Sequence, residues 1–184
     1  MTETAPYEIT EKMGTIEFRR YPDLILASVT DTGDDSGFGL LFQYITGNNR
    51  TRGKIPMTAP VITGEQIPMT SPVITSRPIP MTAPVVSDGR SMSFVMPAGK
   101  TRDELPEPVD PRVQITSLPS REMAVLRFSG YAGKEDVDQA TSRLLEGIKE
   151  TGITTRGRVV VMRYNAPWTP GFLRRNEVGI EIVR

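Results

Sequence analysis

The 184-residue chain contains no histidine and no cysteine. Without cysteine it cannot form a disulfide bond. Without either residue it cannot build a Ser-His-Asp or Cys-His nucleophile, an imidazole or thiolate zinc site, or a haem site with a His or Cys axial ligand. The side chains left for chemistry are carboxylates, lysine, arginine, tyrosine, serine, threonine and nine methionines. Composition alone therefore excludes most of the common catalytic and metal-binding arrangements.

The sequence also lacks an excess of charge and a long apolar run. Its 22 Lys and Arg balance 22 Asp and Glu, so no overall field would attract nucleic acid or an anionic membrane. No window approaches the roughly 20 apolar residues that cross a bilayer, and residues 1–10 lack a basic and apolar signal pattern. We therefore expect a cytoplasmic protein with no membrane span and no nucleic-acid partner. The length fits a single domain over residues 1–184.

Two segments have the spacing of amphipathic helices, residues 36–46 and 134–151. Apolar side chains recur there every three or four positions, which places them on one face of a helix. They are Phe38, Leu41, Phe42 and Ile45 in the first segment, and Val137, Ala140, Leu144, Leu145 and Ile148 in the second. Gly47 and Gly152 follow the two segments as stop signals.

Six further segments have the pattern of strands. They are residues 15–21, 24–30, 112–117, 122–129, 158–164 and 177–183. In the first, Ile16 and Phe18 fall on one face while Glu17 and Arg19 fall on the other. The simplest account is an antiparallel sheet with one face in water.

The order of these predicted elements repeats. A strand, a short turn that contains proline, a second strand and a helix run from residue 15 to 46 and again from 112 to 151, and further strands follow each helix. We therefore predict an α+β fold. It is a distorted antiparallel β-barrel or sheet flanked by two helices, built from two similar β-β-α-β halves at about residues 7–96 and 112–184.

Between residues 55 and 85 one phrase occurs three times. The copies IPMTAPV, IPMTSPV and IPMTAPV begin at Ile55, Ile67 and Ile79, a period of 12 residues. Two prolines in each copy exclude helix and predict an extended backbone. The apolar side chains favour an arm that covers an apolar edge of the fold. Alternatives are a methionine-lined lip over a ligand, a Cu(I) methionine cluster, and a docking arm for a protein partner.

Several phrases together resemble the SOUL haem-binding protein family. They are FRRYP at residues 18–22, FGLLFQYI at 38–45, KIPMTAPV at 54–61, FVMP at 94–97, YNAPW at 164–168 and RRNEV at 174–178, in the order of the family. The resemblance implies a distorted antiparallel β-barrel with two helices, made of two similar halves, and a distant relation to GyrI-like effector-binding domains. It also implies that haem, a related tetrapyrrole or another small hydrophobic ligand binds in a groove beside the first helix. The absence of histidine and the tripled MTAPV-type unit are departures from the family pattern.

A haem site needs an apolar slot for the macrocycle and cations for the two propionates. The residues that we predict to line the groove are Leu40, Tyr44, Arg50, Arg52, Lys54, Met57, Trp168, Phe172, Arg174 and Arg175. Iron ligation would fall first to Met57, next to Met69 or Met81, then to Tyr44 or Tyr164, or it would be absent.

Two other functions stay open. One is a GyrI-like sensor or hydrolase of a cationic or aromatic small molecule, in which Glu177 is the charge partner or base beside Tyr164. This hypothesis requires Glu177 to be buried, although alternation places it on the opposite face from Val178. The other is a protein-interaction scaffold that uses the repeat at residues 55–85. No motif brings catalytic groups together, so we do not expect an enzyme.

Overall fold

The computed structural model describes residues 3–30, 34–50, 55, 58–64, 91–165 and 169–184, and the structural statements below concern these residues. They form two α-helices, α1 (Asp34–Thr46) and α2 (Lys134–Thr151), and two short 3-10 helices, η1 (Arg102–Glu104) and η2 (Gly171–Leu173). The strands are β1 (Glu3–Thr4), β2 (Glu8–Met13), β3 (Ile16–Tyr21), β4 (Leu24–Val29), β5 (Thr58–Gly64), β6 (Ser91–Val95), β7 (Gln114–Leu118), β8 (Arg121–Phe128), β9 (Thr154–Arg163) and β10 (Asn176–Val183).

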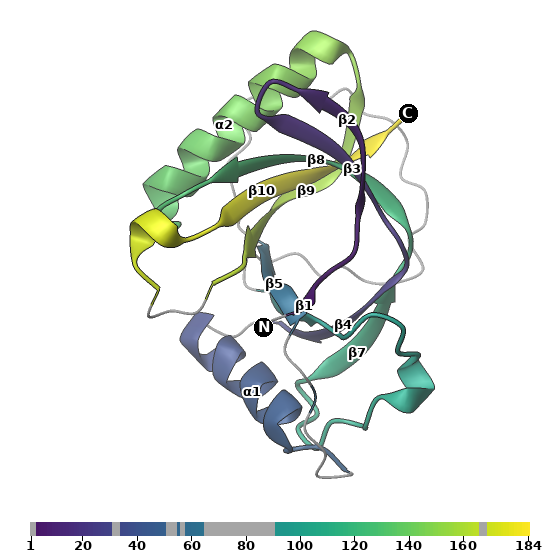
Figure 1. The fold of residues 1–184 in the computed structure, drawn as a ribbon. Helices are drawn as coiled ribbons and strands as arrows, with labels where there is room; N and C mark the ends of the chain where they lie inside the picture. Colours follow the sequence, from purple (N-terminus) through teal and green to yellow (C-terminus); the bar gives the residue numbers. More distant parts are fainter. Residues whose placement is uncertain (1–2, 31–33, 51–54, 56–57, 65–90, 166–168) are drawn as a thin grey trace.

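The strands belong to one strongly curved sheet (Figure 1). Its order is β2-β3-β8-β10-β9-β5-β6-β4-β7, and every pairing along this path is antiparallel. The short β1 pairs with β5 in parallel. Because β2 and β7 are the two ends of the path, the ladders among the described strands leave the sheet open. The predicted α+β fold, a distorted antiparallel sheet with two helices, is confirmed.

The strands β3 and β4 do not pair with each other. Instead β3 pairs with β8 and β4 with β7 in one common register, from Ile16 opposite Leu126 to Ser28 opposite Gln114. Both segments bend at a proline, which has no N–H for the ladder. At the bend the Ser120 N–H donates to the Asp23 carboxylate at 2.7 Å. The turns predicted at these prolines are therefore bends within two long paired segments, not hairpin turns.

The two halves of the chain share one order of elements. Strand, strand, helix, strand, strand describes β3, β4, α1, β5, β6 and also β7, β8, α2, β9, β10. Each half thus has one strand more than the predicted β-β-α-β unit, although the strands predicted at 158–164 and 177–183 already included both strands after α2. The agreement extends to an irregularity in the ladders. The β5–β6 register shifts between Thr58 and Val61, and the β9–β10 register shifts between Gly179 and Glu181.

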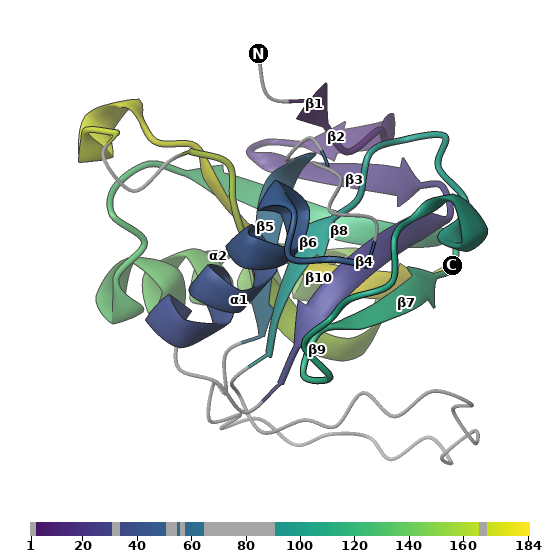
Figure 2. The same cartoon turned by 90° about the horizontal axis from the view of Figure 1, so that it is seen from below.

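Each helix covers its own part of the sheet (Figure 2). The α2 helix packs on β8 and β10, where Leu144 and Val178 belong to one buried cluster, while α1 packs on β4 and β6 through Leu41. A third buried cluster, which includes Met123 and Met162, lies on the sheet face turned away from α2. Strand alternation assigns Glu177, Gly179 and Glu181 of β10 to this inner face.

Only part of the triple repeat lies within the described residues. Residues 58–64 of the first copy and its linker form β5, which confirms the predicted extended backbone for that segment. The second and third copies lie outside the described residues, so the predicted roles of the repeat as an arm, lip, methionine cluster or docking segment stay predictions. None of the described helices has both the length and the apolar character of a membrane span.

Candidate functional site

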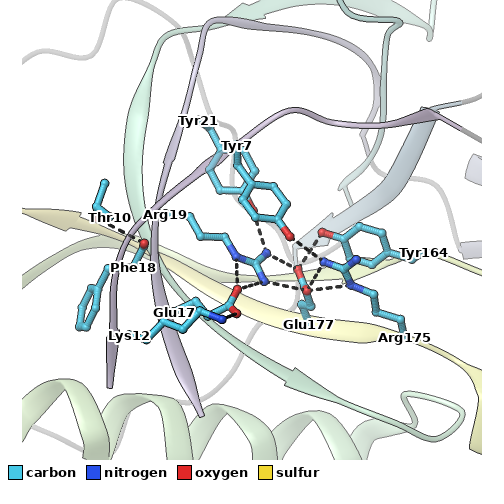
Figure 3. A network of polar contacts seen from close by, with 10 residues as sticks. All are labelled: Tyr7, Thr10, Lys12, Glu17, Phe18, Arg19, Tyr21, Tyr164, Arg175 and Glu177. Atoms are coloured by element: carbon cyan, nitrogen blue, oxygen red, sulfur yellow. Dashed lines mark hydrogen bonds and ion pairs between the residues drawn. The ribbon is translucent and has the colours of Figure 1, made fainter. Parts of the chain in front are cut away.

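Glu177 lies at the centre of a buried polar network on the inner face of the sheet (Figure 3). Its side chain is 0% exposed. Two guanidinium groups bind its carboxylate: Arg19 donates from its two terminal nitrogens at 2.7 and 3.0 Å, and Arg175 donates from Nη2 at 2.7 Å and from Nε at 3.0 Å. The Tyr164 hydroxyl donates to the same carboxylate at 2.7 Å. Side chains from β3, from the residue that follows β9 and from the residue that precedes β10 therefore converge on one negative charge of β10.

A second layer holds the two arginines in place. Glu17 accepts hydrogen bonds from Arg19 at 2.6 and 2.9 Å, and the Tyr21 hydroxyl accepts another at 3.2 Å. The Tyr7 hydroxyl accepts a hydrogen bond from Arg175 at 3.1 Å. The Arg19 guanidinium lies 4.2 Å from the centre of the Tyr7 ring, so the N-terminal segment covers the network.

Electrostatics keeps the network in one charge state. Burial disfavours the charged form of Glu177, but the hydrogen bonds and charge of Arg19, with those from Tyr164 and Arg175, lower its pKa below the ordinary value. Burial raises the pKa of Tyr164 far above its ordinary value, and the adjacent Glu177 carboxylate raises it further. Glu177 is therefore a carboxylate, and Tyr164 is a protonated donor.

A small cavity of about 150 Å³ opens beside this network. Its lining residues are Tyr7, Thr15, Glu17, Arg19, Val125, Arg127 and Arg175. The exposed Arg127 lies opposite Glu177 in the β8–β10 register. The wall has three arginines and one carboxylate, but the hydrogen bonds to Glu17, Tyr21 and Glu177 already use every N–H of Arg19. The cavity is also too small for a macrocycle.

The geometry bears directly on the sensor or hydrolase hypothesis. Glu177 is buried and bonded to Tyr164, as that hypothesis requires. However, Arg19 and Arg175 already neutralise the carboxylate, so it is not free to hold a cationic ligand or to accept a proton.

A second surface lies on the segment between β9 and β10, around η2. Phe172, Leu173 and Tyr131 are 81%, 62% and 68% exposed. The Tyr131 ring lies against Gly171, where a Cβ atom would be 2.6 Å from the ring, and the Arg174 guanidinium lies 4.7 Å from the ring centre. We call Tyr131, Phe172, Leu173 and Arg174 the η2 patch. It combines an apolar surface with a guanidinium group.

The described residues that were predicted to line one groove have different surroundings in the structure. Leu40 is half-buried against the core cluster under α1, and Tyr44 is 1% exposed with its hydroxyl donating to the Pro106 carbonyl at 2.8 Å. Arg50 is exposed and forms an ion pair with Glu107 at 2.9 Å. Phe172 and Arg174 belong to the η2 patch, while Arg175 belongs to the Glu177 network. Arg52, Lys54, Met57 and Trp168, with the alternative ligands Met69 and Met81, lie outside the described residues.

Sequence reasoning missed the role of Arg19. Alternation places Arg19 with Glu17 on a face predicted to be wet, but Arg19 is 3% exposed. The sheet curves so that this face becomes its interior, and the N-terminal segment covers it. The signal was present, since FRRYP, YNAPW and RRNEV contain Arg19, Tyr164, Arg175 and Glu177, which meet in the fold.

The two tyrosines predicted as iron ligands have other partners in the structure. No group of three or more acidic, His or Cys side chains gathers in a metal-binding arrangement among the residues in the described ranges. Met92, Met96, Met123 and Met162 are buried in the core. Tyr44 and Tyr164 donate their hydroxyl protons to Pro106 and Glu177.

Comparison with known proteins gives a family and a fold. The family model described as SOUL heme-binding protein matches residues 2–181. Solved structures with a similar fold include the EcmrR C-terminal domain (TM-score 0.55, 10% identity, 97% of this chain and 98% of that chain) and a hydrolase from Listeria innocua (TM-score 0.57, 9% identity, 95% and 94%). An uncharacterized conserved protein from Listeria innocua is also similar (TM-score 0.59, 10% identity, 92% of both chains). No curated protein matches the chain. At these identities the structural likeness shows a shared fold.

Proposed function

Because the chain belongs to the SOUL haem-binding protein family, we propose that it binds haem or a related tetrapyrrole without a covalent bond. The observation that supports a location for this site is the η2 patch. Phe172 and Arg174, two of the residues predicted from the sequence to line the site, lie there beside exposed Tyr131 and Leu173. In Figure 1, η2 lies next to the N-terminal end of α2, at the left of the molecule, where α1 also lies.

The chemistry of the η2 patch suits a flat, apolar ligand with carboxylate groups. Large apolar side chains that are exposed together are typical of binding surfaces. Burying a phenylalanine side chain contributes about 1.5–3 kcal/mol, which corresponds to roughly 10-fold to 100-fold in affinity. Arg174 supplies a planar guanidinium that matches the geometry of a propionate. When bound, the macrocycle would be held by these contacts and not by a His or Cys ligand, since the chain has neither.

Titration of the purified protein with hemin, followed in the Soret band, tests the proposal. We expect saturable binding of one hemin per chain, which Phe172→Ala weakens about tenfold or more. Val109→Ala is the matched control, because Val109 is also an exposed apolar residue but lies between η1 and β7. No saturable change at micromolar hemin would refute the function. Equal affinities of the two variants would refute the location.

A parallel titration with iron-free protoporphyrin IX tests how the ligand is held. If contacts to the ring and propionates provide the affinity, hemin and protoporphyrin IX bind with similar strength. A large preference for hemin would show that an axial ligand contributes, with Met57 the first candidate. The two titrations therefore separate the existence of a tetrapyrrole site from the mode of ligation.

A further inference from the structure

A second cavity, of about 340 Å³, lies on a different part of the sheet from the Glu177 network and the η2 patch. Its lining residues are Ser120, Arg121, Glu122, Arg156, Glu181, Ile182, Val183 and Arg184. On the inner face, Glu181 of this cavity is separated from Glu177 by Gly179, over which the ends of Met123 and Met162 pack. The cavity is therefore independent of the site proposed above.

The side chain of Arg121 is unusual in this cavity. Its Nε atom is buried and has no hydrogen-bond partner, and just one other side-chain polar atom in the described part of the chain, Thr141 Oγ1, shares that condition. Register places Arg121 opposite Tyr21, so its side chain points to the inner face. Burial lowers the pKa of Arg121. The negative charge of Glu181, which is too far away to form an ion pair with Arg121, acts in the opposite direction.

The carboxylates near Arg121 already have other partners. Glu181 lies 3.8 Å from Arg156, and Glu122 lies 2.7 Å from Arg20. Arg184 forms an ion pair with Glu11 at 2.7 Å and lies 4.0 Å from Glu122. Ser120 uses its N–H and its hydroxyl on Asp23 and Tyr21. Three arginines and two glutamates thus face the cavity, and the charge left without a neutralising contact is that of Arg121.

A buried guanidinium N–H without an acceptor is costly to keep. The same position would accept an unbranched apolar side chain, since the stem of arginine is itself apolar. The arrangement becomes favourable when an acceptor enters the cavity. Because the planar guanidinium matches the oxygens of carboxylate and phosphate groups, an oxyanion is the natural acceptor.

We propose that this cavity is a binding site for a small oxyanion, a carboxylate or phosphate group, with Arg121 as its principal donor and Arg156 as a second cation. The site has no overlap in residues with the η2 patch or with the Glu177 network. The anion would complete the hydrogen bonds of Arg121 and offset the excess positive charge of the cavity wall.

Nitrogen-15 NMR of the arginine Nε–H groups tests the proposal directly. Inorganic phosphate and sodium acetate are titrated separately at constant ionic strength, so that screening does not change. We expect a saturable shift of the Arg121 Nε resonance, assigned by its absence in Arg121→Met, and the tighter of the two salts identifies phosphate or carboxylate as the preferred group. A resonance that neither salt moves overturns the site.

Thermal unfolding gives the second measurement, because an anion that binds the folded state raises Tm. We expect the preferred anion to raise the Tm of the wild-type protein and of Arg158→Gln, an exposed arginine on β9, the same strand as Arg156. The rise should be lost in Arg121→Met and reduced in Arg156→Gln. Arg121→Lys, which keeps the charge but loses the planar fork, should weaken the effect even if the methionine variant does not fold. An equal rise in Arg121→Lys and wild type overturns the role of Arg121.

Discussion

Glu177 holds a negative charge where solvent does not reach, and the two arginines that bind it come from opposite ends of the sequence. Desolvation of three charged groups is costly, so the network as a whole adds little net stability compared with apolar packing. Removal of one member is different, because it leaves the others buried without a partner. The network is therefore sensitive to single substitutions.

Glu177→Gln tests this sensitivity. It leaves Arg19 and Arg175 facing a neutral amide, and we expect the free energy of unfolding to fall by about 3–5 kcal/mol in urea denaturation. Glu122→Gln is the control, because Glu122 pairs with the exposed Arg20 at 2.7 Å and an exposed pair contributes about 0–1 kcal/mol. Similar losses in both variants would show that the buried network has no special role.

The pH dependence of stability follows from the lowered pKa of Glu177. A carboxyl whose pKa is lower in the folded than in the unfolded protein adds stability above its ordinary pKa of 4.5, and this stability is lost as the pH falls through the folded pKa. The difference in unfolding free energy between wild type and Glu177→Gln should therefore be constant near neutral pH and shrink below about pH 4.5. Urea titrations over this range measure it. A difference that grows on acidification would contradict the assignment.

Tyr164 donates to Glu177 and should matter through its hydroxyl alone. Tyr164→Phe removes one hydrogen bond to a buried charge, and we expect a loss of about 1.5–3 kcal/mol. Tyr131→Phe is the matched control, since the Tyr131 side chain is exposed, and its expected effect is within about 0.5 kcal/mol. The same urea denaturation compares the two, and a loss confined to Tyr131→Phe would refute the prediction.

Some members of this network are predictable from the sequence and others are not. Tyr164 and Glu177 lie near each other in the chain, and their pairing is predictable because a buried acid needs a donor. Arg19 is 158 residues from Glu177, and its polar neighbour Glu17 gives β3 the pattern of a strand with a wet face. The curvature of the sheet, which turns this face inward, depends on pairings between β3 and β8 that alternation does not specify.

Among the helices and strands, the local sequence pattern predicts the bounds of some elements well and misses others. The helix predicted at residues 134–151 has those bounds in the structure, and the other predicted helix begins at Asp34 instead of residue 36. The strand β2 was missed because its six residues are mostly polar and exposed, as suits the edge of a sheet. The prolines of the repeat predicted the extended backbone of β5 but not its pairing in the sheet, because Pro60 has no N–H for a ladder.

A pair of helical glycines tests how closely the helices approach the sheet. Gly147 of α2 faces Ile16 of β3, whose side chain occupies the place of a Cβ atom, whereas Gly39 of α1 has open space. Alanine favours helix over glycine by about 0.5–1 kcal/mol, so Gly39→Ala should stabilise the protein by that amount. Gly147→Ala should destabilise it by about 1–3 kcal/mol, because the methyl group displaces packed side chains. Thermal or urea unfolding of both variants measures these changes in stability. Stabilisation by both substitutions would contradict the close approach of Gly147 to β3.

At the scale of the whole molecule, the ladders join the two halves so extensively that neither has a complete sheet alone. The strand pairs β3–β8, β4–β7 and β5–β9 all cross from one half to the other. We expect that fragments 1–99 and 100–184, divided at the exposed turn around Gly99, are unfolded separately and form the native structure when mixed. Proton–nitrogen NMR spectra of each fragment and of the mixture measure this. A dispersed spectrum from either fragment alone would contradict it.

The matching registers of the two halves have a consequence for the ancestry of the fold. The central ladder pairs Thr63 with Val161, and the flanking ladders repeat in the same order on each side, including the irregularity in β5–β6 and β9–β10. Two copies of a single half, related by a two-fold axis at that ladder and exchanging their first strands, would make the same set of pairings. The fold thus has the geometry of a strand-exchanged homodimer joined into one chain. In a homodimer each side chain occurs twice. Joining the copies removes that constraint. In the β9–β10 ladder Glu177 lies opposite Met162, whereas in the β5–β6 ladder the corresponding residue, opposite Gly64, is Ser91.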